Sequence, residues 1–196
     1  MASKVTKLKG LFCLNLLWLI CSVPIITIGA STTAMYYVAM KSHRGEEVNL
    51  TKDFFKSFKQ NFGEATAIWV IIAAVGAAIG FFGYKALKMT GNFSTVAEVI
   101  TFIVVFLYAM TIIYVFPILA RYDNPVFKTI RFSFAVASVS IANTVITIIW
   151  WIAVAASVYF LPYMAILWLL IGNILIADYT AKTCCEVFAN VIKTRE

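Results

Sequence analysis

Four long apolar runs dominate this sequence and limit what it can fold into. They cover residues 65–84, 96–120, 132–160 and 163–181, and an α-helix needs about 20 such residues to cross a bilayer. Hydrophobic residues make up 62% of the 196-residue chain, against roughly 45–50% in soluble domains. A soluble core of this size could not hide that surface. We therefore predict an all-α, polytopic transmembrane helical bundle with four clear spans, in one membrane domain over residues 1–196.

The segment before these runs, residues 8–40, predicts a broken helical hairpin. Pro24 and Gly29 interrupt its apolar pattern, and proline disrupts a helix interior. The hairpin either forms two short spans or is re-entrant. About 12 residues of helix reach only ~18 Å, which favours the re-entrant alternative.

The basic residues predict the orientation of the chain. Fourteen of the 16 lysines and arginines lie before residue 10, in 41–59, in 121–131 and in 182–195. Cytoplasmic loops of membrane proteins are enriched in these residues, so we expect both termini and the 41–59 segment in the cytoplasm. The net charge of +7 then reflects contact with a lipid bilayer, and we expect no nucleic acid partner.

Residues 50–62 predict a cytoplasmic amphipathic helix. Its phenylalanines share one face beside several lysines. Such a helix either lies on the inner leaflet or docks against another subunit. The candidate partner-docking residues are Phe54, Phe55, Phe58, Lys59 and Phe62.

Small residues recur at helical spacing in the first long run. Ala73 and Ala77 form one small-xxx-small pair, and Gly76 and Gly80 form another. Small residues allow helix backbones to approach closely in membranes. We expect these four residues to pack against a helix of the same chain or of a second subunit.

The candidate intramembrane polar residues in the apolar segments are Asn15, Asn143, Asn173 and Asp178. Intramembrane polar groups usually face the protein interior or a cavity. The simplest expectation for Asp178 is an i,i+4 pair with Lys182, with a transport or proton role as the alternative. His43 is expected to be a solvated loop residue.

The sequence carries no motif for the enzyme classes considered. It has no G-x-x-x-x-G-K-[ST] phosphate loop and no H-E-x-x-H zinc motif. It also has no G-x-S-x-G nucleophile elbow. The lone histidine and the four cysteines lack metal-ligand spacing. We therefore expect a non-enzymatic protein without catalytic residues, cofactor or metal.

Four stretches of the chain carry a resemblance to a known family. They are NLLWLICSVPIITIGASTTAMYY at 15–37, RGEE at 44–47, DFFKSFKQNFGEAT at 53–66 and YVFPILARYDNP at 114–125. The chain resembles a family of bacterial membrane proteins of unknown function, often called YesL-like. The resemblance implies a Gram-positive-type bacterial origin, a plasma-membrane location and an association with carbohydrate importers of the ABC class.

Two functions are compatible with these observations. The first is an accessory subunit of a bacterial ABC-type carbohydrate (oligosaccharide) importer, in contact with its permease subunits. The alternative is a free-standing small-solute transporter or channel. Its site would lie where the turn at 24–29 meets Asn15 and Asn173, because broken helices at mid-membrane are a transporter feature.

Overall fold

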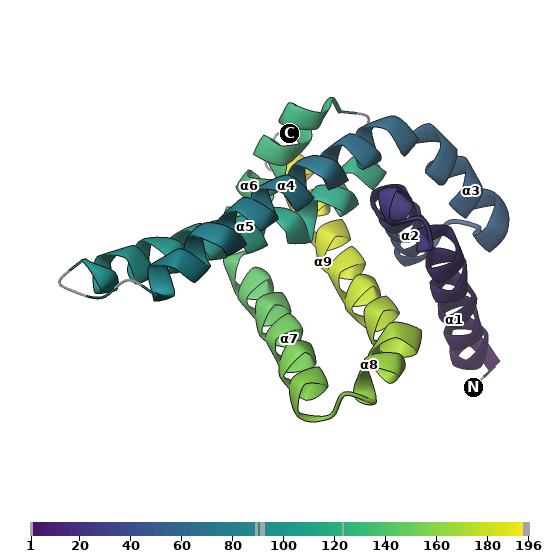
Figure 1. Cartoon of the computed structure of the whole chain (residues 1–196). Helices are drawn as coiled ribbons and strands as arrows, with labels where there is room; N and C mark the ends of the chain where they lie inside the picture. Colours follow the sequence, from purple (N-terminus) through teal and green to yellow (C-terminus); the bar gives the residue numbers. More distant parts are fainter. Residues whose placement is uncertain (1, 89, 91–92, 123, 194–196) are drawn as a thin grey trace.

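The computed structural model describes residues 2–88, 90, 93–122 and 124–193, and every regular element within these ranges is helical. The elements are α1 (Ala2–Ser22), η1 (Ile25–Thr27), α2 (Ile28–His43), α3 (Leu50–Gln60), α4 (Phe62–Leu87), α5 (Ser94–Arg121), α6 (Val126–Val139), α7 (Ile141–Phe160), α8 (Met164–Leu167), η2 (Trp168–Gly172) and α9 (Asn173–Lys193). The η1 element is a 3-10 turn and η2 is a π-helical turn. The prediction of an all-α protein is confirmed (Figure 1).

Three helices, α4, α5 and α7, are long and apolar enough to cross a membrane. Their 26, 28 and 20 residues correspond to lengths of about 39, 42 and 30 Å, against a hydrocarbon core of about 30 Å. A fourth candidate exists if α8, η2 and α9 act as one span, which is bent by 44°. The chain therefore has the helices of a membrane protein.

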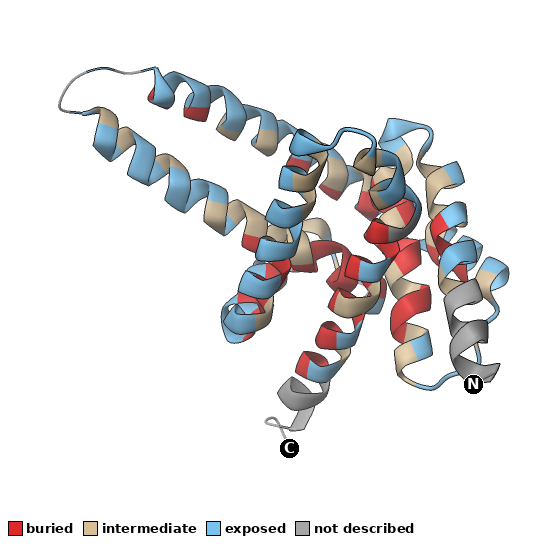
Figure 2. Cartoon of the chain, turned by 90° about the horizontal axis from the view of Figure 1, so that it is seen from below, coloured by how far each residue is buried: buried red, intermediate tan, exposed pale blue. Residues whose placement is uncertain are grey.

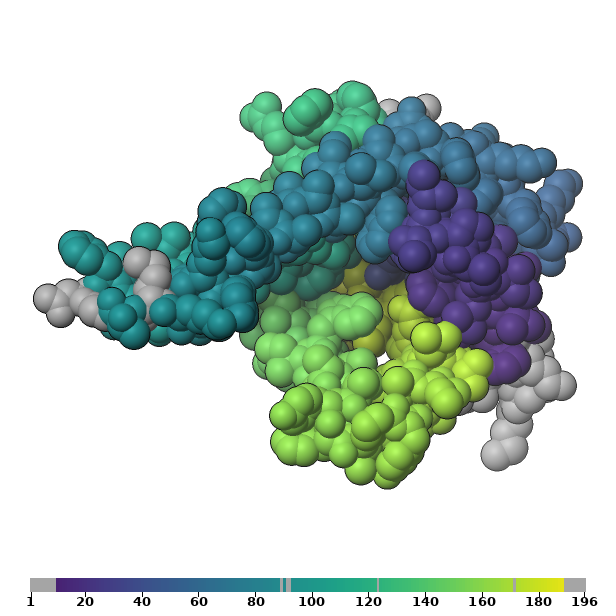
Figure 3. All heavy atoms as spheres, viewed as in Figure 1, coloured from purple at the N-terminus to yellow at the C-terminus, as the bar shows by residue number. Residues whose placement is uncertain are grey.

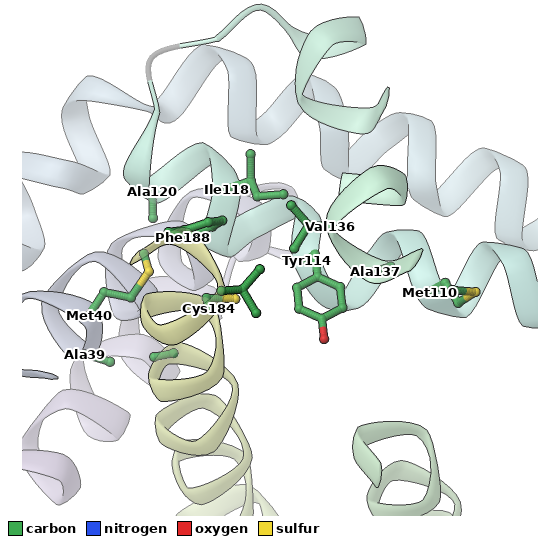
Figure 4. Close-up of a cluster of buried hydrophobic side chains, with 12 residues drawn as sticks. Ala39, Met40, Met110, Tyr114, Ile118, Ala120, Val136, Ala137, Cys184 and Phe188 are labelled. Carbon is green, nitrogen blue, oxygen red and sulfur yellow. The ribbon is translucent and has the colours of Figure 1, made fainter. Parts of the chain in front are cut away.

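The centre of the molecule is α2, which packs against α1, α3, α4, α5 and α9. Small and medium side chains cover its buried faces, and Ala30, Ala34 and Met40 are fully buried. One buried cluster joins the end of α2 to α5, α6 and α9, with Tyr114 and Phe188 among its members (Figure 4). Two others join α2 to α1, α3 and α9, and to α4 and α5.

The outer halves of α4 and α5 leave this body together as a projecting arm (Figure 1). Figure 2 shows that the buried residues concentrate in the body, whereas the arm is mostly exposed. Large apolar side chains on the arm are exposed, including Phe82 at 67% and Phe102 at 73%. In water this surface would be unfavourable, so the arm requires lipid or another helix around it.

The prediction of a single helix over 132–160 is wrong, because the structure divides this segment into α6 and α7 at Ser140. The backbone of Ser140 leaves the helical region, with φ −107° and ψ 41°. Its N–H closes α6 on Val136 O at 3.0 Å. Thr144 Oγ1 lies 2.9 Å from Ser140 O and 3.2 Å from Ala137 O, so a buried hydroxyl bonds to backbone on both sides of the break.

The chain is also interrupted between α1 and α2. Pro24 has no N–H to donate and holds an extended conformation, with ψ 112°. Thr27 Oγ1 donates to the Cys21 carbonyl at 2.5 Å. This hydroxyl therefore provides a hydrogen bond to a backbone carbonyl at the end of α1. The 16 residues of α2 span about 24 Å. Whether 8–40 crosses the membrane or re-enters stays a prediction.

The amphipathic helix ends earlier than the predicted range of 50–62. It covers Leu50–Gln60, and Asn61 separates it from α4. Asn61 Nδ2 donates to the Ser57 carbonyl at 3.0 Å, which satisfies the end of α3. Phe62 therefore belongs to the first turn of α4. The cytoplasmic location of both termini also stays a prediction.

Candidate functional site

The π-helical turn η2 interrupts the last helical segment, and Asn15 of α1 reaches it. Asn15 Nδ2 donates to the Leu169 carbonyl at 3.0 Å and to the Leu170 carbonyl at 2.7 Å. Asn15 is only 1% exposed. Its amide therefore gives the widened turn two hydrogen bonds from a helix more than 150 residues away. Single π-helical turns within α-helices are frequent at functional sites.

Two amide groups beside this turn have unused hydrogen-bonding capacity. Asn15 Oδ1 and Asn173 Nδ2 are buried atoms without a hydrogen-bond partner among the described residues. A buried polar atom left unsatisfied costs about 1–3 kcal/mol. An acceptor and a donor are therefore available to a polar group brought to this place.

A cavity of about 260 Å³ lies beside Asn173. Its wall includes three tryptophans from three segments, Trp18 of α1, Trp151 of α7 and Trp168 of η2. Trp18 Nε1 donates to Thr32 Oγ1 at 3.0 Å, which joins α1 to α2 at the cavity edge. The lining is almost entirely apolar, with Asn173 as its amide-bearing residue.

A second cavity of about 190 Å³ adjoins the first, and both share Trp168 and Gly172. Thr147 and Trp150 of α7 face Tyr179 of α9 across it. Figure 3 shows the molecular surface hollowed between α7 and α9. Ligand sites usually occupy about 300–1,000 Å³, so together the two cavities suit a small molecule.

Trp168 and Gly172 shape both cavities as a pair. Trp168 Nε1 donates to Ser157 Oγ at 2.7 Å, which holds the indole against α7. A Cβ atom on Gly172 would lie 1.9 Å from Trp168 Cε3. Any side chain at this glycine would therefore displace the indole that both cavities share.

The other two predicted intramembrane polar residues lie along α7 and α9. Asn143 Oδ1 accepts a long hydrogen bond of 3.4 Å from the Tyr179 hydroxyl. Asp178 Oδ1 lies 2.8 Å from His43 Nε2, and the two side chains are 24% and 12% exposed. This pair connects the end of α2 to α9.

The expected Asp178–Lys182 pair is therefore wrong. Lys182 Nζ instead lies 3.9 Å from Glu186 Oε1. The solvated-loop reading of His43 is also wrong, because His43 ends α2 and is largely covered. The two partners are 135 residues apart, so no local pattern could have revealed the pair.

The transporter site predicted at the turn of 24–29 is not assembled as expected. Asn15 and Asn173 do lie beside the same π-helical turn. The turn η1 contacts α1, α2 and α4 instead. A Cβ on Gly29 would lie 2.3 Å from the Ala65 carbonyl oxygen, which shows how closely this segment approaches α4.

The structure divides the partner-docking residues of α3 into buried and exposed ones. Phe54 is 0% exposed and packs against Leu14, Met35 and Val38, so its predicted docking role is corrected. Phe58 is half-buried. The exposed members are Lys59, Phe55 at 40% and Phe62 at 41%.

Electrostatic contacts attach α3 to α2. Lys41 Nζ lies 2.8 Å from Asp53 Oδ2, and the Asn49 N–H donates to the same oxygen at 2.9 Å. The hydrogen bond from Lys41 holds the pKa of the Asp53 carboxyl below its usual range, and the Asn49 N–H acts in the same direction. Asn49 also caps α3 by accepting from the Lys52 N–H at 3.2 Å.

The small residues of α4 are likewise divided between two environments. Gly76 faces Tyr108 of α5, whose hydroxyl donates to the Ile72 carbonyl at 2.6 Å. Ala73, Ala77 and Gly80 are exposed. A Cβ on Gly80 would meet no atom within 4 Å. Only Gly76 of the four therefore packs closely within the chain.

Among the residues with described side chains, no three His, Cys, Asp or Glu groups gather as metal ligands would. The candidate functional site is therefore the pair of cavities at η2, with Asn173 in the wall of one of them and Asn15 hydrogen-bonded to the turn.

Residues 11–81 match the model of a protein family described as "Protein of unknown function, DUF624". The match covers the second half of α1, all of α2 and α3 and most of α4, including Asn15 and the small residues of α4. Comparisons with curated proteins and with solved structures gave no match. The N-terminal part of this chain is thus similar to an uncharacterised family, and η2 and α9 lie outside the matched range.

Proposed function

We propose that this chain is a non-enzymatic subunit of a bacterial plasma-membrane assembly, an accessory subunit of an ABC-type carbohydrate (oligosaccharide) importer. The observation that supports a subunit role is the exposed α4–α5 arm (Figure 2). The YesL-like resemblance supports the link with carbohydrate import. In this proposal the chain has four spans, and both termini face the cytoplasm.

The small residues left exposed on α4 support a helix-docking surface on the arm. At about 100° per residue, Ala73, Ala77 and Gly80 lie within a narrow sector of the helix. Their side chains occupy little space, so a permease helix could approach the α4 backbone closely. Gly76 lies on the neighbouring sector, which already faces Tyr108 of α5.

Co-purification from native membranes in mild detergent tests this proposal. We expect importer permease subunits to accompany the wild-type chain. Gly80→Leu should reduce their recovery, because the larger side chain separates the helices. It should leave the monomer folded, since a Cβ there meets no atom within 4 Å.

Ala74→Leu is the matched control, because Ala74 is exposed on a different sector of the same helix. It should retain the permease subunits at the wild-type level. A wild-type chain that is recovered alone, although importer subunits are present in the membrane, would overturn the proposal.

A free-standing small-solute transporter is the second candidate, and the cavities at η2 favour it. A helix interrupted within the membrane is a feature of transporter binding sites. The unsatisfied Nδ2 of Asn173, which lines one of the cavities, could bond to a polar solute there. Uptake by the purified chain in liposomes, lost in Asn173→Leu, would support this function. Liposomes without uptake across a panel of small solutes would exclude it.

A further inference from the structure

The contacts of α3 with α1 and α2 determine which of its faces remains free. Phe54 is fully buried among residues of these helices. Asp53, the only acidic residue of α3, turns toward Lys41 and is 8% exposed. The helix is therefore held in one rotation, with its single carboxylate already neutralised by a cation of α2.

The free face carries a basic stripe of Lys52, Lys56 and Lys59. All three lysines are exposed, and at about 100° per residue they lie within a sector of roughly 60°. The ion pairs found among the described residues involve Lys41, His43, Arg44 and Lys182, and none involves the basic stripe. Three positive charges therefore point away from the body.

Exposed aromatic rings border the basic stripe on one side. Phe55 is 40% exposed and Phe62 is 41% exposed. The helical wheel places Phe55 within a quarter turn of Lys52 and Lys59, between the stripe and the buried face. Phe62 follows in the first turn of α4, with its ring centroid 5.6 Å from that of Phe58. Lysines extend to polar headgroups while apolar neighbours enter the boundary of the acyl chains.

The position of α3 in the chain brings this face to a membrane surface. Only Asn61 separates α3 from α4, which is long and apolar enough to span the bilayer. Since α3 precedes a span directly, it lies at the level where headgroups begin.

We propose that the free face of α3 binds the surface of an anionic lipid leaflet, with the basic stripe on the phosphates of acidic phospholipids and Phe55 and Phe62 in the acyl boundary. Charge complementarity identifies the occupant. Three exposed lysines, with no exposed carboxylate on the same helix, are complementary to an anionic surface. This inference concerns α3 alone, so its outcome is independent of the permease contact and of the cavities.

Electron paramagnetic resonance with spin-labelled lipids tests the proposal on the full-length chain. The chain is reconstituted in phosphatidylcholine membranes that contain a trace of spin-labelled phosphatidylglycerol or of spin-labelled phosphatidylcholine. We expect the wild type to bind the anionic label preferentially, and less so at high salt because exposed charges are screened. Replacing the stripe by Lys52→Gln, Lys56→Gln and Lys59→Gln should remove most of this preference. Each lysine near an anionic surface contributes about fivefold.

The arginine triple variant at the same positions is the matched control, because it keeps the charge and should retain the preference. Circular dichroism should show unchanged helicity in both variants, since the lysines are exposed. Wild-type preference in the glutamine variant would overturn the proposal. If that variant instead loses a co-purifying protein, the stripe docks a protein and the lipid assignment is wrong.

Discussion

Gly29→Ala tests the closest approach between two helices of the body. A Cβ atom at this position would lie 2.3 Å from Ala65 O and 2.9 Å from Trp69 Cβ. Carbon atoms pack best at about 3.5–4.0 Å, and the nearest obstacle is backbone that cannot rotate away. The start of α2 and the facing turn of α4 must therefore separate by about 1 Å.

The expected cost follows from this overpacking. Extra methyl groups in a well-packed core destabilise by about 1–3 kcal/mol, and alanine recovers up to about 1 kcal/mol through its helix propensity. We expect the free energy of unfolding to fall by about 1–2 kcal/mol. The buried cluster of Ala30, Ala65 and Ile68 lies at the same contact and would loosen with it.

Unfolding by sodium dodecyl sulfate in mixed micelles, followed by circular dichroism, measures this change. Gly80→Ala is the control, because its Cβ meets no atom within 4 Å and its helix propensity rises. It should be as stable as the wild type or slightly more stable. Equal stability of Gly29→Ala and wild type would refute the close approach of α2 to α4.

Three further changes probe the remaining polar contacts. Asn15→Leu removes both hydrogen bonds to η2. At about 0.6 kcal/mol for each intramembrane hydrogen bond, the free energy of unfolding in the same assay should fall by about 1 kcal/mol, and an unchanged midpoint would contradict this. A double-mutant cycle of His43→Gln and Asp178→Asn should show a coupling energy of about 1 kcal/mol, whereas additive effects would mean that the pair contributes nothing. The hydrogen bond from Lys41 lowers the pKa of Asp53 in the folded chain. The stabilisation of the fold by this contact is therefore complete above the unfolded pKa of about 4, and it is lost as pH falls through the lower folded pKa. Asp53→Asn should flatten the plot of thermal midpoint against pH in this acidic range. An unaltered plot would count against the Lys41–Asp53 pair.

Local sequence determined most of the helical and apolar segments, because both depend on neighbouring residues. The predicted runs 65–84 and 96–120 lie inside α4 and α5. The conformational restriction of Pro24 acts within the same few residues, and the chain is interrupted there between α1 and α2. The break at Ser140 was not predicted from the sequence. The hydroxyl that bonds to the Ser140 carbonyl belongs to Thr144, a full turn away and buried against Tyr114 of α5.

The sequence singled out two amides of the candidate site, but neither the tryptophans that line the cavities nor their arrangement. Intramembrane asparagines are conspicuous in an apolar segment, so Asn15 and Asn173 could be singled out. The π-helical turn that brings them together requires a glycine under the Trp168 indole and a hydrogen-bonding partner from α1. Neither requirement follows from a periodic pattern.

The sequence by itself determined that this chain forms apolar helices long enough to cross a membrane and that α3 has an apolar and a basic side. The 3.6-residue period and the chemistry of the side chains are sufficient for those conclusions. Only the tertiary structure decided that Phe54 faces the core while the lysines face outward, and that His43 pairs with Asp178. The physical reason is that these contacts depend on the relative placement of helices far apart in the chain, and that placement is determined by packing of the whole body.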